Sequence, residues 1–200
     1  MRLTGYPKTM QLKDGTEVIL RPMTEKDKDK LHEFFHSLPE DDKLYLRDDV
    51  DKKETIEKWV KNLDYDRVLP ILAEIGGKIV GDATLHRPAY GWMSHVGSIR
   101  IVVDKRFRKK GLGTLLAREI FYQALKVGLE KLVAEMASKQ SSAIKVFDAL
   151  GFHQEALLQK HIVDSKGRKH DLVIMANDVE DLWKKIQDAW EESFPSHPKE

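Results

Sequence analysis

The strongest constraint on the fold is a basic stretch with two glycines, RFRKKGLGT, which separates a short apolar strand from a long apolar helix. The residues before it, 95–103 (HVGSIRIVV), are rich in β-branched side chains, which favours a strand. Residues 112–127 then repeat leucine and isoleucine at helical spacing, and a further apolar strand is expected at 132–137. This order predicts a right-handed crossover at the centre of a layered domain.

The segments on either side extend this layered pattern. Residues 17–23 alternate around β-branched side chains and predict a strand, and two amphipathic helices follow. The pair Gly76-Gly77 between two apolar runs predicts a hairpin. Downstream, a helix at 141–150 precedes two strands joined by the turn DSKG. We therefore expect an α/β fold with a mixed α+β sheet flanked by helices.

Composition limits the classes of function. The 200 residues include 34 Lys and Arg and 33 Asp and Glu, which gives a net charge of +1 instead of the basic footprint typical of nucleic-acid-binding proteins. There is no cysteine, so thiolate metal sites and a cysteine nucleophile are excluded. The N-terminus lacks a signal-peptide core, and no apolar run is long enough to span a membrane. We expect a soluble cytoplasmic protein without nucleic-acid or membrane partners.

The glycine-containing stretch has the chemistry of an anion site. A helix that starts after a strand presents free backbone N–H groups and a partial positive charge. A side chain at Gly111 or Gly113 would hold a phosphate away from that backbone. The stretch fits neither the Walker A pattern nor the Rossmann fingerprint. We therefore predict a pyrophosphate cradle made of Arg108, Lys109, Lys110, Gly111, Leu112, Gly113 and Thr114.

Two motifs together identify a family resemblance. The first is R-x-x-G-x-G, at Arg108, Gly111 and Gly113, and the second is A-x-x-x-F-x-x-x-G-F, from Ala143 to Phe152. With them the sequence resembles the GNAT superfamily of acyl-CoA-dependent N-acyltransferases. The resemblance implies a GNAT-like fold with a splayed central sheet over residues 1–177. It leaves residues 178–200 as a C-terminal helical extension and tail.

The resemblance also implies a ligand and its contacts. The cradle would hold the pyrophosphate of acetyl-CoA, and the preceding strand would hydrogen-bond the pantetheine arm through Ile101, Val102 and Val103. The later helix would border the cofactor through Ser141, Ser142 and Lys145. The implied reaction is transfer of an acetyl group by direct attack of a primary amine, on a small molecule, a peptide or a protein lysine.

The acid–base positions depart from the family pattern. The customary glutamate falls near Ser98 or Gly97, and the customary tyrosine falls on Phe147, so neither position carries a proton-transfer group. A backbone N–H near Val103 could polarise the thioester carbonyl. His86 could relay the proton, and Asp82 would share its face of the strand. These two residues alone do not make a metal site, and none is expected.

Two alternatives to an enzyme remain open. The empty acid–base positions favour a non-catalytic acyl-CoA-binding regulatory module, while the basic stretch offers a weaker case for a nucleic-acid module. The C-terminal segment from Asp178 to Ser193 is expected to be a helix, whose apolar stripe either packs on its own domain or forms a homodimer. That stripe comprises Val179, Leu182, Trp183, Ile186 and Trp190.

Overall fold

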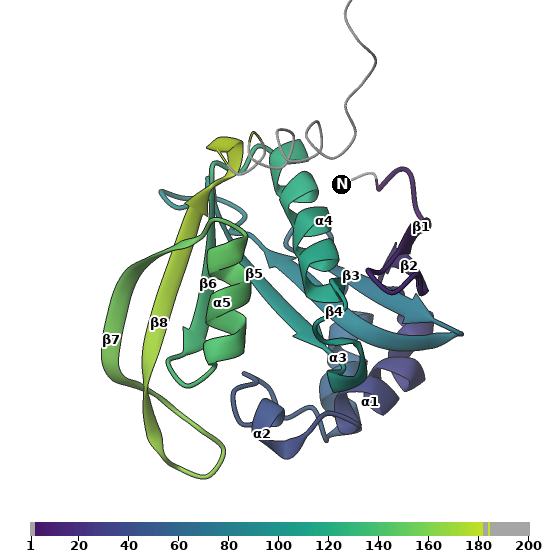
Figure 1. Cartoon of the computed structure of the whole chain (residues 1–200), viewed down its shortest axis with the longest axis horizontal. Coiled ribbons are helices and arrows are strands. Elements are labelled where there is room, and N and C mark those ends of the chain that lie inside the picture. The colour runs from purple at the N-terminus through teal and green to yellow at the C-terminus, as the bar shows by residue number, and fades with distance from the viewer. Residues whose placement is uncertain (1–2, 182–183, 185–200) are drawn as a thin grey trace, which may run out of the picture.

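A single mixed sheet organises the computed structural model, which describes residues 3–181 and 184 (Figure 1). Its strand order is β1-β2-β3-β4-β5-β6-β8-β7. All neighbouring strands are antiparallel except β5 and β6, which the central crossover joins in parallel. The strands are β1 (Lys8–Gln11), β2 (Glu17–Pro22), β3 (Val68–Ile75), β4 (Lys78–His86), β5 (Val96–Val103), β6 (Lys131–Ala137), β7 (His153–Val163) and β8 (Lys169–Asp178).

Helices cover both faces of this sheet. In Figure 1, α4 and α5 lie on one face and α1 and α3 on the other, with α2 below the sheet. A short 3₁₀ turn at Glu25–Asp27 precedes α1, and another at Lys105–Phe107 includes the start of the glycine stretch. In the described part of the chain, no helix is both long and apolar enough to cross a membrane. The helices are α1 (Lys28–His36), α2 (Glu40–Lys43), α3 (Lys53–Lys61), α4 (Leu112–Lys126) and α5 (Ser141–Ala149).

The core is divided between the two faces. On the α4 face, Leu112, Leu116 and Ile120 recur at i, i+4 and i+8 and are fully buried, because this spacing aligns them in one stripe against the sheet. On the other face, a second cluster forms around Phe35 of α1 and Ile56 of α3. The two cores hold β4 and β5 between them and so fix the strands that position the candidate site.

The sheet opens between β5 and β6. The two strands pair only from Val96 to Ser98, opposite Lys131 to Val133. Beyond Ser98 they diverge, and Figure 1 shows the gap widening toward α2. The α/β fold with a splayed sheet that the sequence predicted is therefore confirmed.

The differences from expectation lie at short or polar elements. The exposed strand β1 and the four-residue α2 were not anticipated, because neither has an apolar period. The N-cap of α5 is Gln140, not Ser141 or Ser142, and its side-chain oxygen accepts a hydrogen bond from the Ala137 N–H. In the C-terminal segment Val179 is buried in the core. The other members of its stripe, Leu182, Trp183, Ile186 and Trp190, lie outside the described residues.

Gly97 supports the point where β5 and β6 are still paired. A Cβ there would lie 2.7 Å from Leu129 Cδ1 and 3.1 Å from side-chain atoms of Leu132 and Leu85. We therefore expect Gly97→Ala to destabilise the fold by about 1–3 kcal/mol through overpacking. Thermal unfolding would measure this, with Gly128→Asn, at an open left-handed turn, as a milder control. An unchanged melting temperature for Gly97→Ala would contradict the packing described here.

Candidate functional site

The backbone of β5 turns alternate residues toward the gap. The Asp104 N–H donates to the Val80 carbonyl at 2.9 Å, which sets the phase of the antiparallel β4–β5 ladder. In such a ladder alternate residue pairs exchange both backbone bonds. Val102, opposite Asp82, therefore bonds to β4, while Ile101 and Val103 direct their N–H and C=O groups toward the gap.

The backbone of β6 completes the other wall. The Val179 N–H donates to the Glu130 carbonyl at 2.8 Å, so the even-numbered residues of β6 bond to β8. Val133 and Glu135 consequently face β5. Val133 is still paired opposite Ser98, whereas Glu135 lies beyond the point where the strands separate. Backbone donors and acceptors thus line both sides of the gap, which suits an extended ligand that pairs as a strand does.

The helix α4 starts at the wide end of this gap. Its N-cap, Gly111, has a φ of +89°, and Lys109 has a φ of +62°, so the chain turns into the helix through two left-handed residues. The N–H groups of Leu112, Gly113 and Thr114 open the helix and have no acceptor within it. A Cβ at Gly113 would only touch Val103 Cγ2 at 3.8 Å. Gly111 thus permits the left-handed turn, whereas Gly113 leaves the backbone N–H groups at the start of the helix uncovered by a side chain.

Among Arg108, Lys109 and Lys110 of the glycine stretch, two side chains are paired with carboxylates and one is not. Arg108 donates through Nε and Nη2 to the Val103 carbonyl, both at 3.1 Å, and pairs with Asp42 of α2 at 2.6 Å. Lys110 pairs with Asp14 at 2.9 Å. Lys109 makes no ion pair with any described residue. Because its two neighbours are engaged by carboxylates, Lys109 is the cation most available to a ligand.

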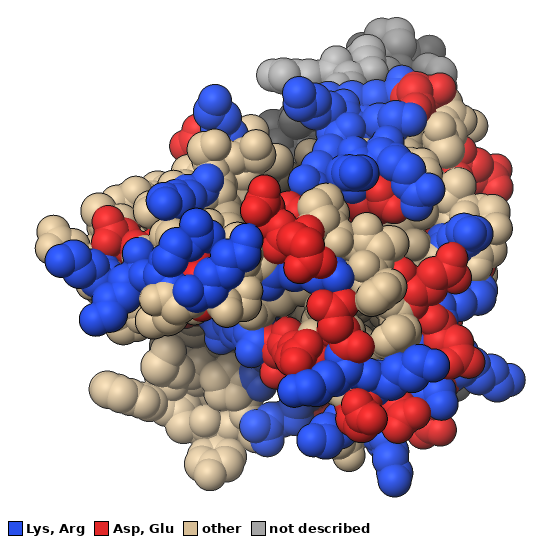
Figure 2. Space-filling model, turned by 90° about the horizontal axis from the view of Figure 1, so that it is seen from below, with Lys and Arg blue, Asp and Glu red and all other residues tan. Residues whose placement is uncertain are grey.

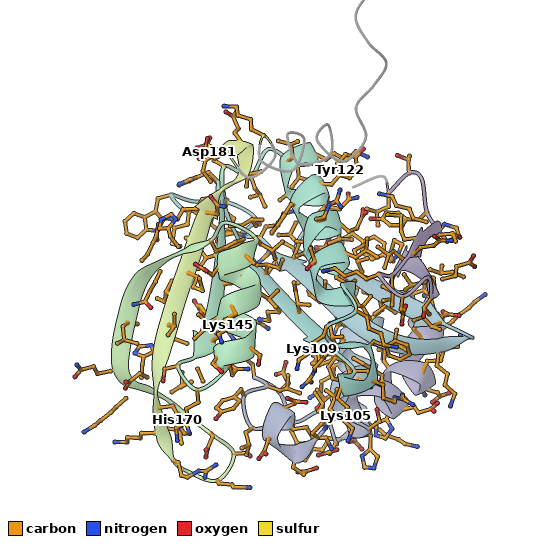
Figure 3. All side chains as sticks on the ribbon, viewed as in Figure 1. Lys105, Lys109, Tyr122, Lys145, His170 and Asp181 are labelled. Carbon is orange, nitrogen blue, oxygen red and sulfur yellow. The ribbon has the colours of Figure 1, made fainter. Side chains whose placement is uncertain are left out.

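The helix α5 supplies the opposite side of the gap. Its Ser141, Ser142 and Lys145 are exposed. Figure 3 shows Lys145 and Lys109 on the two sides of the gap, from α5 and from the glycine stretch. Figure 2 looks from below at the face onto which the gap opens, where acidic and basic side chains are interspersed. The structure thus places the predicted cofactor-binding residues around one opening, except that the backbone of Val102 bonds to β4 instead of facing the gap.

A second group of polar side chains lies on the opposite face of β4 and β5. Ala83, Leu85 and Ile99 point into the α4 core, so their sequence neighbours point to the other face. That row comprises Asp82, Thr84 and His86 on β4, opposite Val102, Arg100 and Ser98 on β5. The expectation that Asp82 and His86 share one face is therefore confirmed.

Burial shifts the pKa values of Asp82 and His86 in opposite directions. Burial raises the pKa of Asp82 to about 7, although a hydrogen bond from Thr84 and the charge of Arg100 act in the opposite direction. Burial also lowers the pKa of His86 to about 4, and the positive charges of Arg100 and Arg47 add to this. At neutral pH, Asp82 is poised between its two protonation states and His86 is neutral.

The positions at which the family pattern places an acid or a base, Gly97 or Ser98 and Phe147, lie in different environments. Gly97 faces the α4 core, where three leucines leave no room for a larger side chain. Ser98 points to the polar row instead, opposite His86. Phe147 is buried, with its ring centroid 5.0 Å from that of Phe152. No group of three potential metal ligands occurs among the described residues.

Two contributions to this site were missed from the sequence. Arg100 was read only as a strand residue, and the segment after α2 carries Arg47, whose guanidinium pairs with Glu135 of β6. This contact joins residues far apart in the chain, and no local pattern could predict it. The alternation of polar residues along β5 is the one sequence signal that could have placed Arg100 beside Asp82.

Known proteins share this architecture. The GNAT domain of S. lividans PAT superposes with a TM-score of 0.75 at 19% identity, over 89% of this chain and 99% of that one. The structure of yncA from Salmonella typhimurium with its cofactor acetyl-CoA gives a TM-score of 0.70 at 19% identity, over 81% and 94%. These likenesses establish the fold.

The sequence comparisons establish the family. N-alpha-acetyltransferase 30 of Xenopus laevis is 28% identical over 97 residues, which are 48% of this chain and 36% of that protein. The chain thus spans about a third of the length of this curated relative. Residues 30–152, well over half of the chain, match the Acetyltransferase (GNAT) family. The chain therefore belongs to the GNAT family of acetyltransferases.

Proposed function

We propose that this protein is an acetyl-CoA-dependent N-acetyltransferase that acts on a primary amine. The observation that carries the proposal is the gap between β5 and β6, with backbone groups of both strands turned toward it and the open N-terminus of α4 at its wide end. The diphosphate of coenzyme A fits the helix opening, since Gly113 has no side chain there. The pantetheine amides fit the strand edges at Ile101 and Glu135.

Asp82 is the residue that we propose as general base. Acetyl-CoA supplies the acetyl group as a thioester, whose carbon–sulfur bond breaks as the amine nitrogen bonds to the acetyl carbon. The amine must first be neutral, and a carboxylate with a pKa of about 7 can take its proton at Oδ near neutral pH. His86, with a pKa of about 4, is a weaker base, and we propose for it a positioning role beside Asp82.

Carbonyl polarisation is the second proposed role of this chain. Val103 adjoins Gly113 at the diphosphate end of the gap. The pantetheine arm separates the diphosphate from the thioester, so the thioester would lie further along β5. We therefore assign polarisation to the gap-facing N–H of Ile101, in place of Val103. Ile101 stands opposite Ala83, between Asp82 and Thr84, and so lies level with the polar row.

Turnover with a panel of amines tests the proposal. Purified protein should release the coenzyme A thiol from acetyl-CoA in the presence of at least one class of primary amine: amino acids, polyamines, peptides with a free N-terminus or lysine peptides. The acetylated amine should be identified by mass spectrometry. Tight coenzyme A binding with no turnover on any class would instead support the non-catalytic acyl-CoA-binding module.

A further inference from the structure

Arg100 lies at the centre of the polar row and has no partner there. Its residue is half-buried, yet its guanidinium makes no hydrogen bond or ion pair with any described residue. Most of the other arginines in the described part of the chain are paired. Six of them form ion pairs with carboxylates: Arg21, Arg47, Arg87, Arg106, Arg108 and Arg168. A partly buried guanidinium that no carboxylate contacts directly leaves its donors available, so its position here favours a ligand.

The surroundings of Arg100 favour an anion. Arg47, from the segment after α2, faces it, and the carboxylate of Glu135 that could neutralise it is paired with Arg47 instead. Asp48 and Asp82 are the other acids that act on it, and neither bonds to it. Burial and the charge of Arg47 both lower the pKa of Arg100, as expected for a guanidinium in a positive field.

The carboxylate of Asp82, which can carry a negative charge, lies on β4, the strand adjacent to that of Arg100. Asp82 stands diagonally across from Arg100 in the β4–β5 register, so the two side chains start about 7–8 Å apart. Asp82 accepts its hydrogen bonds from the Thr84 hydroxyl, at 3.2 and 3.4 Å, not from an arginine. The site therefore presents a cation and a proton acceptor side by side, each free to contact a ligand.

From this juxtaposition we propose that the acceptor is a small zwitterion, a free amino acid, whose carboxylate is bound by Arg100 while its amine faces Asp82. The inference rests on the proposed acetyl transfer and names its substrate class. A guanidinium can bind a carboxylate through two parallel hydrogen bonds, which would orient the amine. In the transfer the ammonium gives one proton to Asp82, and the neutral nitrogen bonds to the acetyl carbon as the carbon–sulfur bond breaks. The second proton of the nitrogen passes through water to the departing sulfur, which leaves as the coenzyme A thiol. A protein N-terminus or a lysine side chain has no carboxylate at this spacing.

Matched pairs of free amino acids and their amides test this class. The two members of each pair differ only in having a carboxylate or a carboxamide. The amine of the amide is less basic, so more of it is neutral, and the amide would react faster at a site that does not bind the carboxylate. We expect the wild-type protein to prefer the acid by about 30- to 100-fold in kcat/KM. Calorimetry on the protein saturated with coenzyme A should show binding of the preferred acid and none of its amide.

Variants of Arg100 make the assignment specific. Arg100→Gln should lose the preference and the calorimetric signal, and Arg100→Lys should restore a fraction of both. Arg67→Gln, which removes an exposed arginine before β3, is the matched control and should behave as wild type. Because the guanidinium of Arg100 makes no hydrogen bond or ion pair with a described residue, the melting temperature of Arg100→Gln should remain close to that of wild type.

The outcomes separate the inference from the function on which it rests. Equal or faster turnover of the amides, or of peptides or polyamines, would overturn the amino-acid class and leave acetyl transfer standing. Retention of the acid preference in Arg100→Gln would also overturn it. Amino-acid binding that depends on Arg100, without turnover of any amine, would support the binding site and contradict the proposed reaction.

Discussion

Replacing Gly113 with aspartate should abolish coenzyme A binding while the fold is retained. Gly113 is the second residue of α4, and a Cβ there meets only Val103 Cγ2 at an ordinary contact distance. An acidic residue in the first turn of a helix is favourable, because it complements the partial positive charge of that end. The same carboxylate would occupy the helix opening and repel a diphosphate. We expect a loss of at least about 100-fold in affinity.

The neutral variant Gly113→Asn is the matched control. It places a side chain of the same size at the same position, so it separates the effect of charge from that of bulk. We expect an intermediate loss for Gly113→Asn and a greater loss for Gly113→Asp. Calorimetric titration with coenzyme A measures both, and thermal unfolding shows whether the fold persists. Affinity retained in a folded Gly113→Asp would refute the diphosphate site at the start of α4.

Gly111 would be a poorer test, although the sequence suggests the same role for both glycines. Its left-handed φ of +89° means that any side chain strains the turn, and a Cβ would lie 3.3 Å from the Lys13 side chain. A loss of binding at Gly111 could therefore follow from distortion of the loop. The pattern R-x-x-G-x-G locates the loop. Only the backbone angles show that Gly111 is required for the left-handed turn and Gly113 is not.

The sequence was most informative where local rules decide the structure. The helix that starts in the glycine stretch, its apolar stripe and the strand β4 are each visible in a short window, and these elements were correctly predicted. The sequence could not predict which residues of β5 direct their backbone groups toward the gap, because this depends on the phase of the hydrogen bonds between β5 and β4. Sequence reasoning accordingly assigned Val102 to the pantetheine, whereas its backbone pairs with Asp82. That assignment is corrected by the register.

Long-range contacts explain the other omissions. The ion pair of Arg47 with Glu135 joins the region of α2 to β6, and that of Arg108 with Asp42 joins it to the glycine stretch. The residues of α2 have no apolar period, so nothing local predicts where they lie. For the same reason the unpartnered state of Arg100 could be found only from the folded structure.

Asp82→Asn should remove the pH dependence of acetyl transfer near neutrality. For the wild type we expect kcat/KM to rise with pH through about 7, because only the deprotonated carboxylate takes a proton from the amine. Without this base the rate should fall by a factor on the order of 10² to 10⁴. The charged or titratable groups around Asp82 are His86 on its own strand, Arg100 on β5, and Arg47, Asp48 and Glu135 beyond it.

His86→Gln is the control that identifies the titrating group. With a pKa of about 4, His86 is already neutral over the range in which the rate rises, so its replacement should leave that rise in place. A rise near pH 7 that disappears in His86→Gln and persists in Asp82→Asn would reverse the assignment.

The stability of the fold provides an independent measurement of the same carboxyl. The pKa of Asp82 is raised from 3.8 to about 7, so the folded state binds its proton more tightly than the unfolded state does. The ionised group therefore costs stability, and that cost grows as the pH rises from about 4 to about 7. Asp82→Asn should raise the melting temperature more at pH 8 than at pH 5, relative to wild type. An equal change at both pH values would show that Asp82 titrates normally, and the assignment of Asp82 as base would fail.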